Sequence, residues 1–176
     1  MSVHPYPALA RRAVAACLAG IPLPTDGGEV GGDEALWGTR QACFVSIKTT
    51  RGALRGCIGT ILPTQPSLDR EIVANAVSAA TRDPRFPPMR REELDGVRFS
   101  VDVLGAPERV SDLHTLDPAR WGVIVSKGMS RGVLLPDLEG VDTVEQQLDI
   151  AMRKAGIASP DGMTVERFAV QRYPEE

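Results

Sequence analysis

The residues that could carry chemistry are concentrated in one hexapeptide, Leu54 to Gly59, which reads Leu-Arg-Gly-Cys-Ile-Gly. Alternate residues of a regular strand share a face, so Leu54 and Ile58 are expected to face the core. Arg55 and Cys57 then point together to the opposite side. Because a neighbouring cation stabilises a thiolate, which is the nucleophilic form of cysteine, Arg55 and Cys57 are the candidate catalytic residues.

Four further residues are candidates for ligand binding. Gly56 and Gly59 carry no side chain, so a ligand or another backbone segment could approach the strand closely there. Asp83 and Arg85 lie in a proline-rich segment, Asp83 to Pro88, whose fixed backbone could present an acid and a base to a pocket. The sequence therefore predicts a site around Cys57, with Asp83 and Arg85 as a second contribution.

Each of these candidates also has a purely structural explanation. A free cysteine in a strand is commonly a core residue. Glycines commonly mark a β-bulge, which would break the alternation and turn Cys57 inward. Asp83 and Arg85 would suit a helix stop followed by a surface ion pair. From the residues alone these alternatives stay open.

Other chemistries are not indicated. The histidines are His4 and His114, and the run Ser111 to His114 holds the letters of a catalytic triad without any spatial relation to support one. Two histidines and no paired cysteines predict no metal site. The glycine-rich run Gly27 to Gly32 lacks the preceding strand and the Lys-Ser/Thr pair of a phosphate-binding loop. It predicts a mobile surface loop, and no cofactor is expected.

Composition narrows the class of protein. The formal net charge is −3 and no long basic run occurs, which argues against nucleic-acid binding. No apolar stretch approaches the roughly 18 residues of a membrane span. The three cysteines are odd in number and irregularly spaced, and no secretory signal is evident. The sequence therefore predicts a cytoplasmic protein without a membrane segment.

The hydrophobic pattern predicts an α+β fold. Helices are expected over residues 8–19, 67–82 and 143–155, the last with a capping box of Thr143 and Gln146. Strands are expected over 41–48, 53–60, 97–103, 122–127, 133–135 and 164–173, forming a mixed β-sheet. The run Thr50 to Leu54 is similar to Ser130 to Leu134, each at a hairpin tip before a proline and a helix. This similarity predicts an internal β-hairpin–helix duplication.

Taken together, the motifs resemble those of the AMMECR family. Leu54 to Gly59 is similar to the family's signature hexapeptide, and the likeness continues through Asp83 to Phe86, Leu134 to Thr143 and Arg153 to Ile157. The last two segments are most similar to the prokaryotic branch, component A of the AmmeMemoRadiSam system.

The resemblance implies a single AMMECR-type domain over residues 1–176. An N-terminal helix and mobile loop would occupy about residues 1–37, and a motif-bearing core about residues 38–176, with a cleft between two subdomains. The resemblance implies no settled biochemical activity, and the oligomeric state is not indicated.

Two functions fit these observations. In the first, the protein is an enzyme or accessory component of a modification pathway, in which Cys57 and Arg55, helped by Asp83 and Arg85, act on a small polar or anionic group. In the alternative, it is a non-catalytic scaffold or substrate-presenting module. The resemblance implies a Memo-type protein and a radical-SAM protein as its partners.

Overall fold

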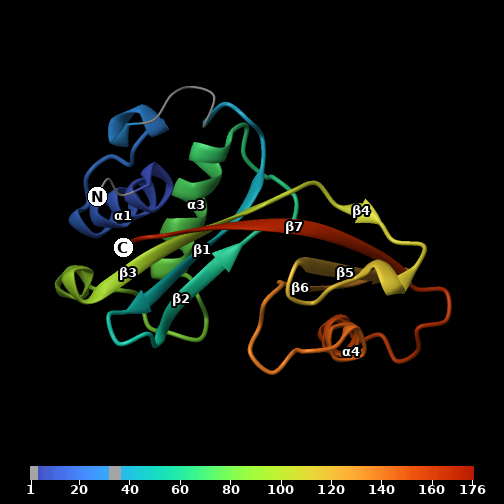
Figure 1. The fold of residues 1–176 in the computed structure, drawn as a ribbon. Helices are drawn as coiled ribbons and strands as arrows, with labels where there is room; N and C mark the ends of the chain where they lie inside the picture. The colour runs from blue at the N-terminus through green and yellow to red at the C-terminus, as the bar shows by residue number, and fades with distance from the viewer. Residues whose placement is uncertain (1–3, 32–36) are drawn as a thin grey trace. The chain divides into compact units, whose positions relative to one another are not determined.

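The computed structural model describes residues 4–31 and 37–176, which form helices and β-strands of an α+β fold (Figure 1). The chain divides into two compact units, the first made of Met1–Val103 and Gln171–Glu176 and the second of Leu104–Val170. The predicted α+β class is confirmed.

The first unit contains α1 (Pro5–Ala19), β1 (Ala42–Thr49), β2 (Leu54–Gly59) and α3 (Leu68–Thr81), with 3-10 helices at Gly27–Val30 and Arg91–Gly96. The second unit contains β4 (Glu108–Arg109), a 3-10 helix at Leu113–Thr115, β5 (Trp121–Lys127), β6 (Ser130–Leu134) and α4 (Val144–Ala155). Strands β3 (Val97–Leu104) and β7 (Thr164–Pro174) each run from one unit into the other.

In the first unit the strands follow the order β2-β1-β3-β7, and α1 and α3 pack together against the sheet (Figure 1). The alternation of β1 buries Val45 and Ile47 completely, in one hydrophobic cluster with residues of both helices. Ser46, between them, is only half-buried. One face of the sheet therefore forms the core with α1 and α3, and the other face carries polar side chains.

In the second unit β5 pairs with both β6 and β7, and β4 pairs with β7. The amphipathic helix α4 places Leu148 and Ala151 in a cluster with Val123, Val125 and Val165. These three pairings, like that of β1 with β2, are antiparallel. The expectation of a mixed sheet is corrected for these strands. Short hairpins connect β1 to β2 and β5 to β6, which makes those two pairings antiparallel.

The helix ends follow the local sequence signals in α4 and depart from them in α3. Thr143 Oγ1 accepts a hydrogen bond from the Gln146 N–H at 3.2 Å, and Gln146 Oε1 accepts one from the Thr143 N–H at 3.0 Å, which confirms the capping box. Gly156 ends α4 with φ 71°. Ser67 occupies the N-cap position of α3, but its hydroxyl donates to Asp69.

The β5–β6 hairpin turns earlier than its sequence predicted. Lys127 pairs with Ser130, so the loop is the two residues Gly128 and Met129, and Gly128 has φ 58°. Ser130 to Gly132, predicted as the turn, belong to β6. The reason is that Gly128 supplies the left-handed conformation that a two-residue hairpin loop needs.

A β-hairpin followed by a packed helix occurs in both units, as the duplication predicts, but with another alignment. A Cβ atom on Gly56 would lie 2.2 Å from the Ala79 carbonyl oxygen of α3. One on Gly132 would lie 2.1 Å from the Ala151 carbonyl oxygen of α4. Gly132 therefore corresponds to Gly56, and not to Gly52 as the sequence comparison placed it.

The glycine-rich segment was predicted as a mobile loop, and its first part is instead the 3-10 helix Gly27–Val30. Gly27 is buried, and its N–H donates to Asp69 Oδ2 at 3.1 Å. The Trp37 ring occupies the space that a Cβ atom on Gly27 would need. Gly27 is thus a packing position, while residues 32–36 of the predicted loop lie outside the described residues.

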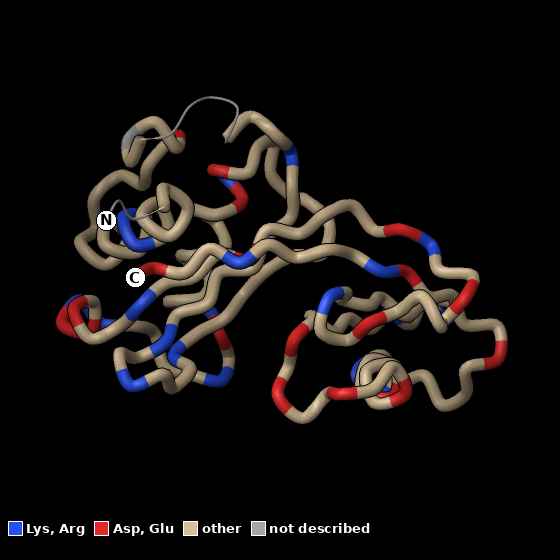
Figure 2. Tube along the Cα trace, viewed as in Figure 1, with Lys and Arg blue, Asp and Glu red and all other residues tan. Residues whose placement is uncertain are grey.

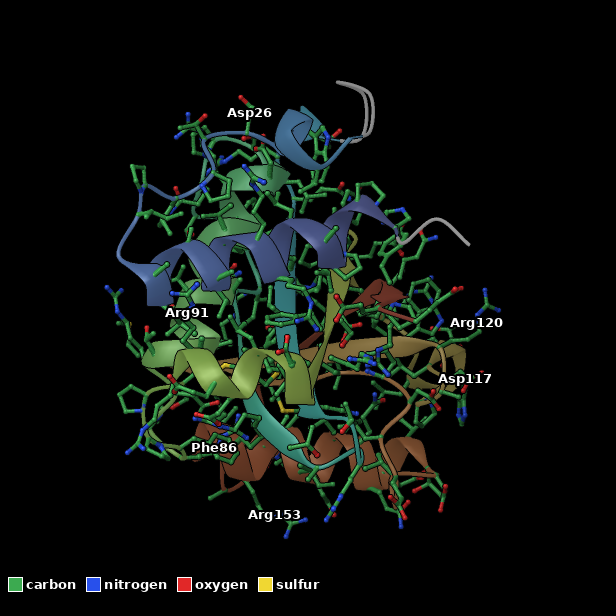
Figure 3. The ribbon with its side chains drawn as sticks, turned by 90° about the vertical axis from the view of Figure 1, so that its left-hand side faces the viewer. Asp26, Phe86, Arg91, Asp117, Arg120 and Arg153 are labelled. Carbon is green, nitrogen blue, oxygen red and sulfur yellow. The ribbon has the colours of Figure 1, made fainter. Side chains whose placement is uncertain are left out.

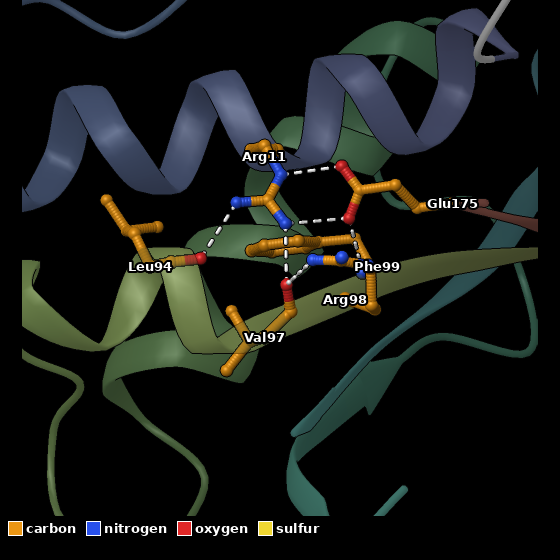
Figure 4. A network of polar contacts seen from close by, with 6 residues as sticks. All are labelled: Arg11, Leu94, Val97, Arg98, Phe99 and Glu175. Carbon is orange, nitrogen blue, oxygen red and sulfur yellow. Dashed lines mark hydrogen bonds and ion pairs between the residues drawn. The ribbon is translucent and has the colours of Figure 1, made fainter. Parts of the chain in front are cut away.

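Arg11 of α1 joins the N-terminal helix to the end of the chain (Figure 4). Its guanidinium donates to both carboxylate oxygens of Glu175, at 2.5 and 2.8 Å. It also donates to the carbonyl oxygens of Leu94 and Val97, and it lies 5.0 Å from the centre of the Phe99 ring. This network holds α1, the strand β3 and Glu175, the residue after β7, together within the first unit.

Candidate functional site

Cys57 lies on the sheet face opposite α1 and α3, directly across from Ser46. The Thr60 N–H donates to the Cys43 carbonyl, and alternation along the ladder from there makes Ser46 and Cys57 a non-hydrogen-bonded pair. Side chains approach closely in such pairs, and Ser46 Oγ donates to Cys57 Sγ at 3.2 Å. The half-buried Cys57 therefore points away from the core, as the strand alternation predicts.

A β-bulge does occur in β2, but at Arg55. Ile47 pairs with Gly56 and the next residue, Lys48, pairs with Leu54, so Arg55 is the extra residue. The bulge moves Leu54 off the core face and leaves Cys57 in place. Leu54 is 38% exposed, so its prediction as a core residue was wrong.

Arg55 is held by partners other than Cys57. Its guanidinium donates to Glu93 Oε2 at 2.7 Å and Oε1 at 3.1 Å, and to the Pro87 carbonyl at 3.0 Å. The hydrogen bonds from Arg55 lower the pKa of Glu93. Arg55 thus fastens the bulge to the loop after α3.

Asp83 and Arg85 together hold the outer edge of β2. In a non-hydrogen-bonded pair, the Cys57 N–H and C=O point away from β1. The N–H donates to Asp83 Oδ2 at 2.9 Å, and the carbonyl accepts from Arg85 Nη2 at 3.3 Å. Arg85 also donates to both carboxylate oxygens of Asp83, at 3.0 and 2.7 Å. The predicted acid–base pair is therefore bound to the backbone of the candidate cysteine.

The electrostatics of this pair are asymmetric. The Asp83 side chain is only 2% exposed, whereas that of Arg85 is 54% exposed. Hydrogen bonds from Arg85 hold the pKa of Asp83 well below its usual range, although burial opposes this. Asp83 raises the pKa of Arg85 in turn. The pair thus presents a permanently charged guanidinium to solvent beside Cys57, anchored by a buried carboxylate.

The chain itself fills the space beside both glycines of the hexapeptide. The Ala79 carbonyl of α3 occupies the position of a Cβ atom on Gly56. The nearest atom of the Phe44 ring lies only 2.2 Å from the position that a Cβ atom on Gly59 would take. Gly56 therefore lets β2 approach α3, and Gly59 makes room for the side chain across the ladder.

The structure brings Cys57, Asp83 and Arg85 together and adds Ser46, which the sequence did not single out. The pairing register of the β1–β2 hairpin could have indicated Ser46, but the bulge at Arg55 shifts that register by one residue. Phe86, labelled in Figure 3, lies in the loop after α3. The Arg55 and Arg85 guanidinium groups lie 5.9 and 5.5 Å from its ring centre. Phe86 thus links the two arginines of the site.

The other cysteines have different surroundings. Cys43 is buried, and burial raises the pKa of its thiol to about 12. Cys17 is half-buried, and all three cysteines are free thiols. Within residues 4–31 and 37–176, no three His, Cys, Asp or Glu side chains gather in a way that could hold a metal ion. In the same residues no helix has the length and apolar character needed to cross a membrane.

Comparison with known proteins places the chain among uncharacterised relatives. A Thermotoga maritima protein is 55% identical over 80% of this chain and 81% of its own length. A Methanosarcina acetivorans protein is 36% identical over 96% of this chain and 88% of its own length. A Clostridium acetobutylicum protein is 47% identical over 81% of this chain, which spans only 30% of that longer protein.

The fold is also found in a crystal structure. An uncharacterized protein from Pyrococcus horikoshii matches with a TM-score of 0.84 and 32% identity, over 97% of this chain and 90% of that one. The AMMECR1 family model matches residues 7–175, which include both units and the whole Cys57 site. The chain therefore belongs to the AMMECR1 family.

Proposed function

We propose that this protein is an enzyme or accessory component of a modification pathway, in which the Cys57 thiol engages a small polar or anionic substrate. The observation that carries the proposal is the Ser46 hydroxyl donating to Cys57 Sγ, on the sheet face that the helices leave open. The Ser46 hydroxyl donates to the sulfur that would react, and the exposed Arg85 guanidinium places positive charge near it.

The roles of the candidate residues differ within this proposal. Cys57 is the nucleophile or thiol ligand. Asp83 and Arg85 are positioning residues for its backbone, and Arg85 can also attract an anionic substrate. Arg55 is a positioning residue as well, because Glu93 and the Pro87 carbonyl take its hydrogen bonds. Gly56 and Gly59 serve the packing of β2.

The test is alkylation of the native protein with iodoacetamide across pH, followed by peptide mass mapping to separate the three cysteines. We expect Cys57 to react in the folded state and Cys43 to react only after unfolding. Replacing Ser46 by Ala removes one hydrogen bond to sulfur, which corresponds to a loss of about 2- to 10-fold in the rate at Cys57. If Cys57 stays unreactive until the protein unfolds, it is not the nucleophile and the proposal is wrong.

A second function, a scaffold or substrate-presenting module, is favoured by one comparison. The matched region makes up only 30% of the Clostridium acetobutylicum relative, so there it is covalently joined to other sequence. A Memo-type protein and a radical-SAM protein are the partners to test. Under this function both would co-purify with the chain, and Cys57→Ser would retain them. No association at high protein concentration would contradict it.

A further inference from the structure

The open sheet face of the first unit contains a hollow of about 200 Å³ beside the thiol. Strands β1 and β3 and the end of β7 line it, and its polar lining consists of Ser46, Lys48, Arg98, Ser100, Arg172 and Glu175. Ser46 is the residue whose hydroxyl donates to Cys57 Sγ. Ser46 therefore contacts both the hollow and the Cys57 thiol.

The carboxylates near this hollow are already paired with their own cations. Glu175 accepts hydrogen bonds from the Arg11 guanidinium and from the Phe99 N–H. The buried Asp102 accepts two from Arg172, at 2.7 and 2.9 Å. These contacts account for the charges of Glu175 and Asp102.

Lys48 and Arg98 supply positive charge that is not balanced in this way. Both are exposed, and in the part of the chain that the structure describes neither forms an ion pair with a carboxylate. Arg98 Nη1 donates to the Val97 carbonyl, which leaves most of its five N–H donors for another group. Figure 2 shows basic positions gathered at this end of the first unit, around the β1–β2 hairpin and the loop after α3.

The composition and size of the hollow indicate what it binds. The Lys48 ammonium, the Arg98 guanidinium and two serine hydroxyls suit a carboxylate or a phosphate group. A hollow of about 200 Å³ is smaller than pockets that enclose a whole drug-sized molecule, so it suits the anionic group of a small ligand. Adjacent strands lie roughly 4.8 Å apart, so that ligand could also reach Cys57 on the neighbouring strand.

We infer that Lys48 and Arg98, with Ser46 and Ser100, form a binding site for the anionic group of the substrate on which Cys57 acts. The inference rests on the proposed function for the link to Cys57. Anion binding in the hollow itself does not depend on the reactivity of the thiol.

The experiment compares two alkylating reagents of similar size, iodoacetate with a negative charge and neutral iodoacetamide. At low salt the ratio of their rates at Cys57 should fall about 2- to 3-fold in Lys48→Gln and again in Arg98→Gln, because each removes one nearby charge. Arg70→Gln is the matched control, since exposed Arg70 lies on α3, which packs on the other face. Inorganic phosphate should slow iodoacetate more than iodoacetamide, and about 0.5 M salt should remove the effect.

A second measurement covers the case in which Cys57 reacts with neither reagent, which would contradict the proposed function. Amide NMR shifts of Ser46, Lys48 and Ser100 are followed while inorganic phosphate is added to the native protein. Saturable shifts that are weakened in Lys48→Gln and Arg98→Gln support the anion site. Shifts that are absent, or unchanged in both variants, overturn it, as does a reagent ratio that falls equally in Arg70→Gln.

Discussion

Asp83 Oδ2 accepts the backbone N–H of Cys57 at 2.9 Å, across 26 residues of sequence. Strand β2 is at the edge of the sheet, so this N–H would otherwise be left without a strand partner. At Cys57, the Asp83 carboxylate and the Arg85 guanidinium make the hydrogen bonds that a neighbouring strand would otherwise make. The same contacts fix the backbone that carries the thiol, so the edge of the sheet and the candidate site are stabilised together.

Replacing Asp83 by Ala should therefore destabilise the protein strongly. The change removes the acceptor of the Cys57 N–H and the ion-pair partner of Arg85 at once, which should reduce the free energy of unfolding by about 2–4 kcal/mol. Urea denaturation measures the change. Glu92→Ala is the control, because Glu92 is exposed, and it should shift the free energy by less than about 0.5 kcal/mol. Equal effects of the two substitutions would contradict the role of Asp83.

Asp83 should also make stability depend on pH in the acidic range. Its pKa is lowered in the folded protein, whereas an unfolded Asp has a pKa of about 3.9. The unfolded state therefore binds the proton first, and the stabilisation from Asp83 is complete above about pH 5 and lost as the pH falls below 4. Urea denaturation between pH 7 and pH 2.5 should show this loss.

Asp83→Asn is the variant that isolates this contribution. It keeps an oxygen acceptor for the Cys57 N–H but cannot titrate, so its stability should fall less steeply with acid than that of the unaltered protein. Glu71 and Glu93 also have lowered pKa values and remain in both proteins. Parallel curves for the two proteins below pH 5 would show that Asp83 does not contribute.

The parts of the fold that local signals determine were predictable from sequence. Thr143, Gln146 and Gly156 specify the two ends of α4 through contacts within a few residues. The alternation expected along β1 and β2 also indicated the outward orientation of Cys57, but from the residues alone a bulge that turned it inward stayed open. The bulge at Arg55 was not predictable, because the sequence of the hairpin does not reveal which of its residues is left unpaired.

The partners in the site depend on contacts between distant residues, which local patterns do not specify. Arg55 and Cys57 are two residues apart, and the expectation that they share a strand face led to the prediction that Arg55 would be the cation of the site. Instead, Glu93 binds Arg55 across 38 residues, and Arg85 reaches Cys57 across 28. The choice between the two arginines is made by the path of the loop after α3.

The two glycines that contact helices, Gly56 and Gly132, offer a matched pair of substitutions, one in each unit. An added methyl group would overlap the carbonyl oxygen of Ala79 or Ala151, and these belong to helix backbones that cannot rotate away. We expect Gly56→Ala and Gly132→Ala each to destabilise the protein by about 1–3 kcal/mol or more. Thermal unfolding followed by circular dichroism measures the effect.

Gly96→Ala is the control for this pair, because no atom lies within 4 Å of a Cβ atom placed there. It should leave the unfolding temperature nearly unchanged. If Gly132→Ala were neutral while Gly56→Ala was destabilising, the correspondence between the two hairpin–helix segments would lose its physical basis. Destabilisation by both supports the alignment of Gly56 with Gly132.

Glu175 should contribute more to stability than a residue next to the end of the chain usually does. Its side chain is 10% exposed and accepts hydrogen bonds from Arg11 and from the Phe99 N–H. Glu175→Ala leaves these donors without their acceptor, so the free energy of unfolding should fall by about 2–3 kcal/mol. Glu175→Gln should reduce the free energy of unfolding less than Glu175→Ala does. Its amide oxygen can still accept a hydrogen bond, but it carries no charge.

The neighbouring Glu176 provides the control, since it is exposed. Glu176→Ala should change the free energy of unfolding by less than about 0.5 kcal/mol, although it removes the same charge from the same end of the chain. Urea denaturation of the three variants separates the network from a general effect of net charge. If Glu175→Ala and Glu176→Ala were equally mild, the Arg11–Glu175 contact would not be holding α1 to the segment that follows β7.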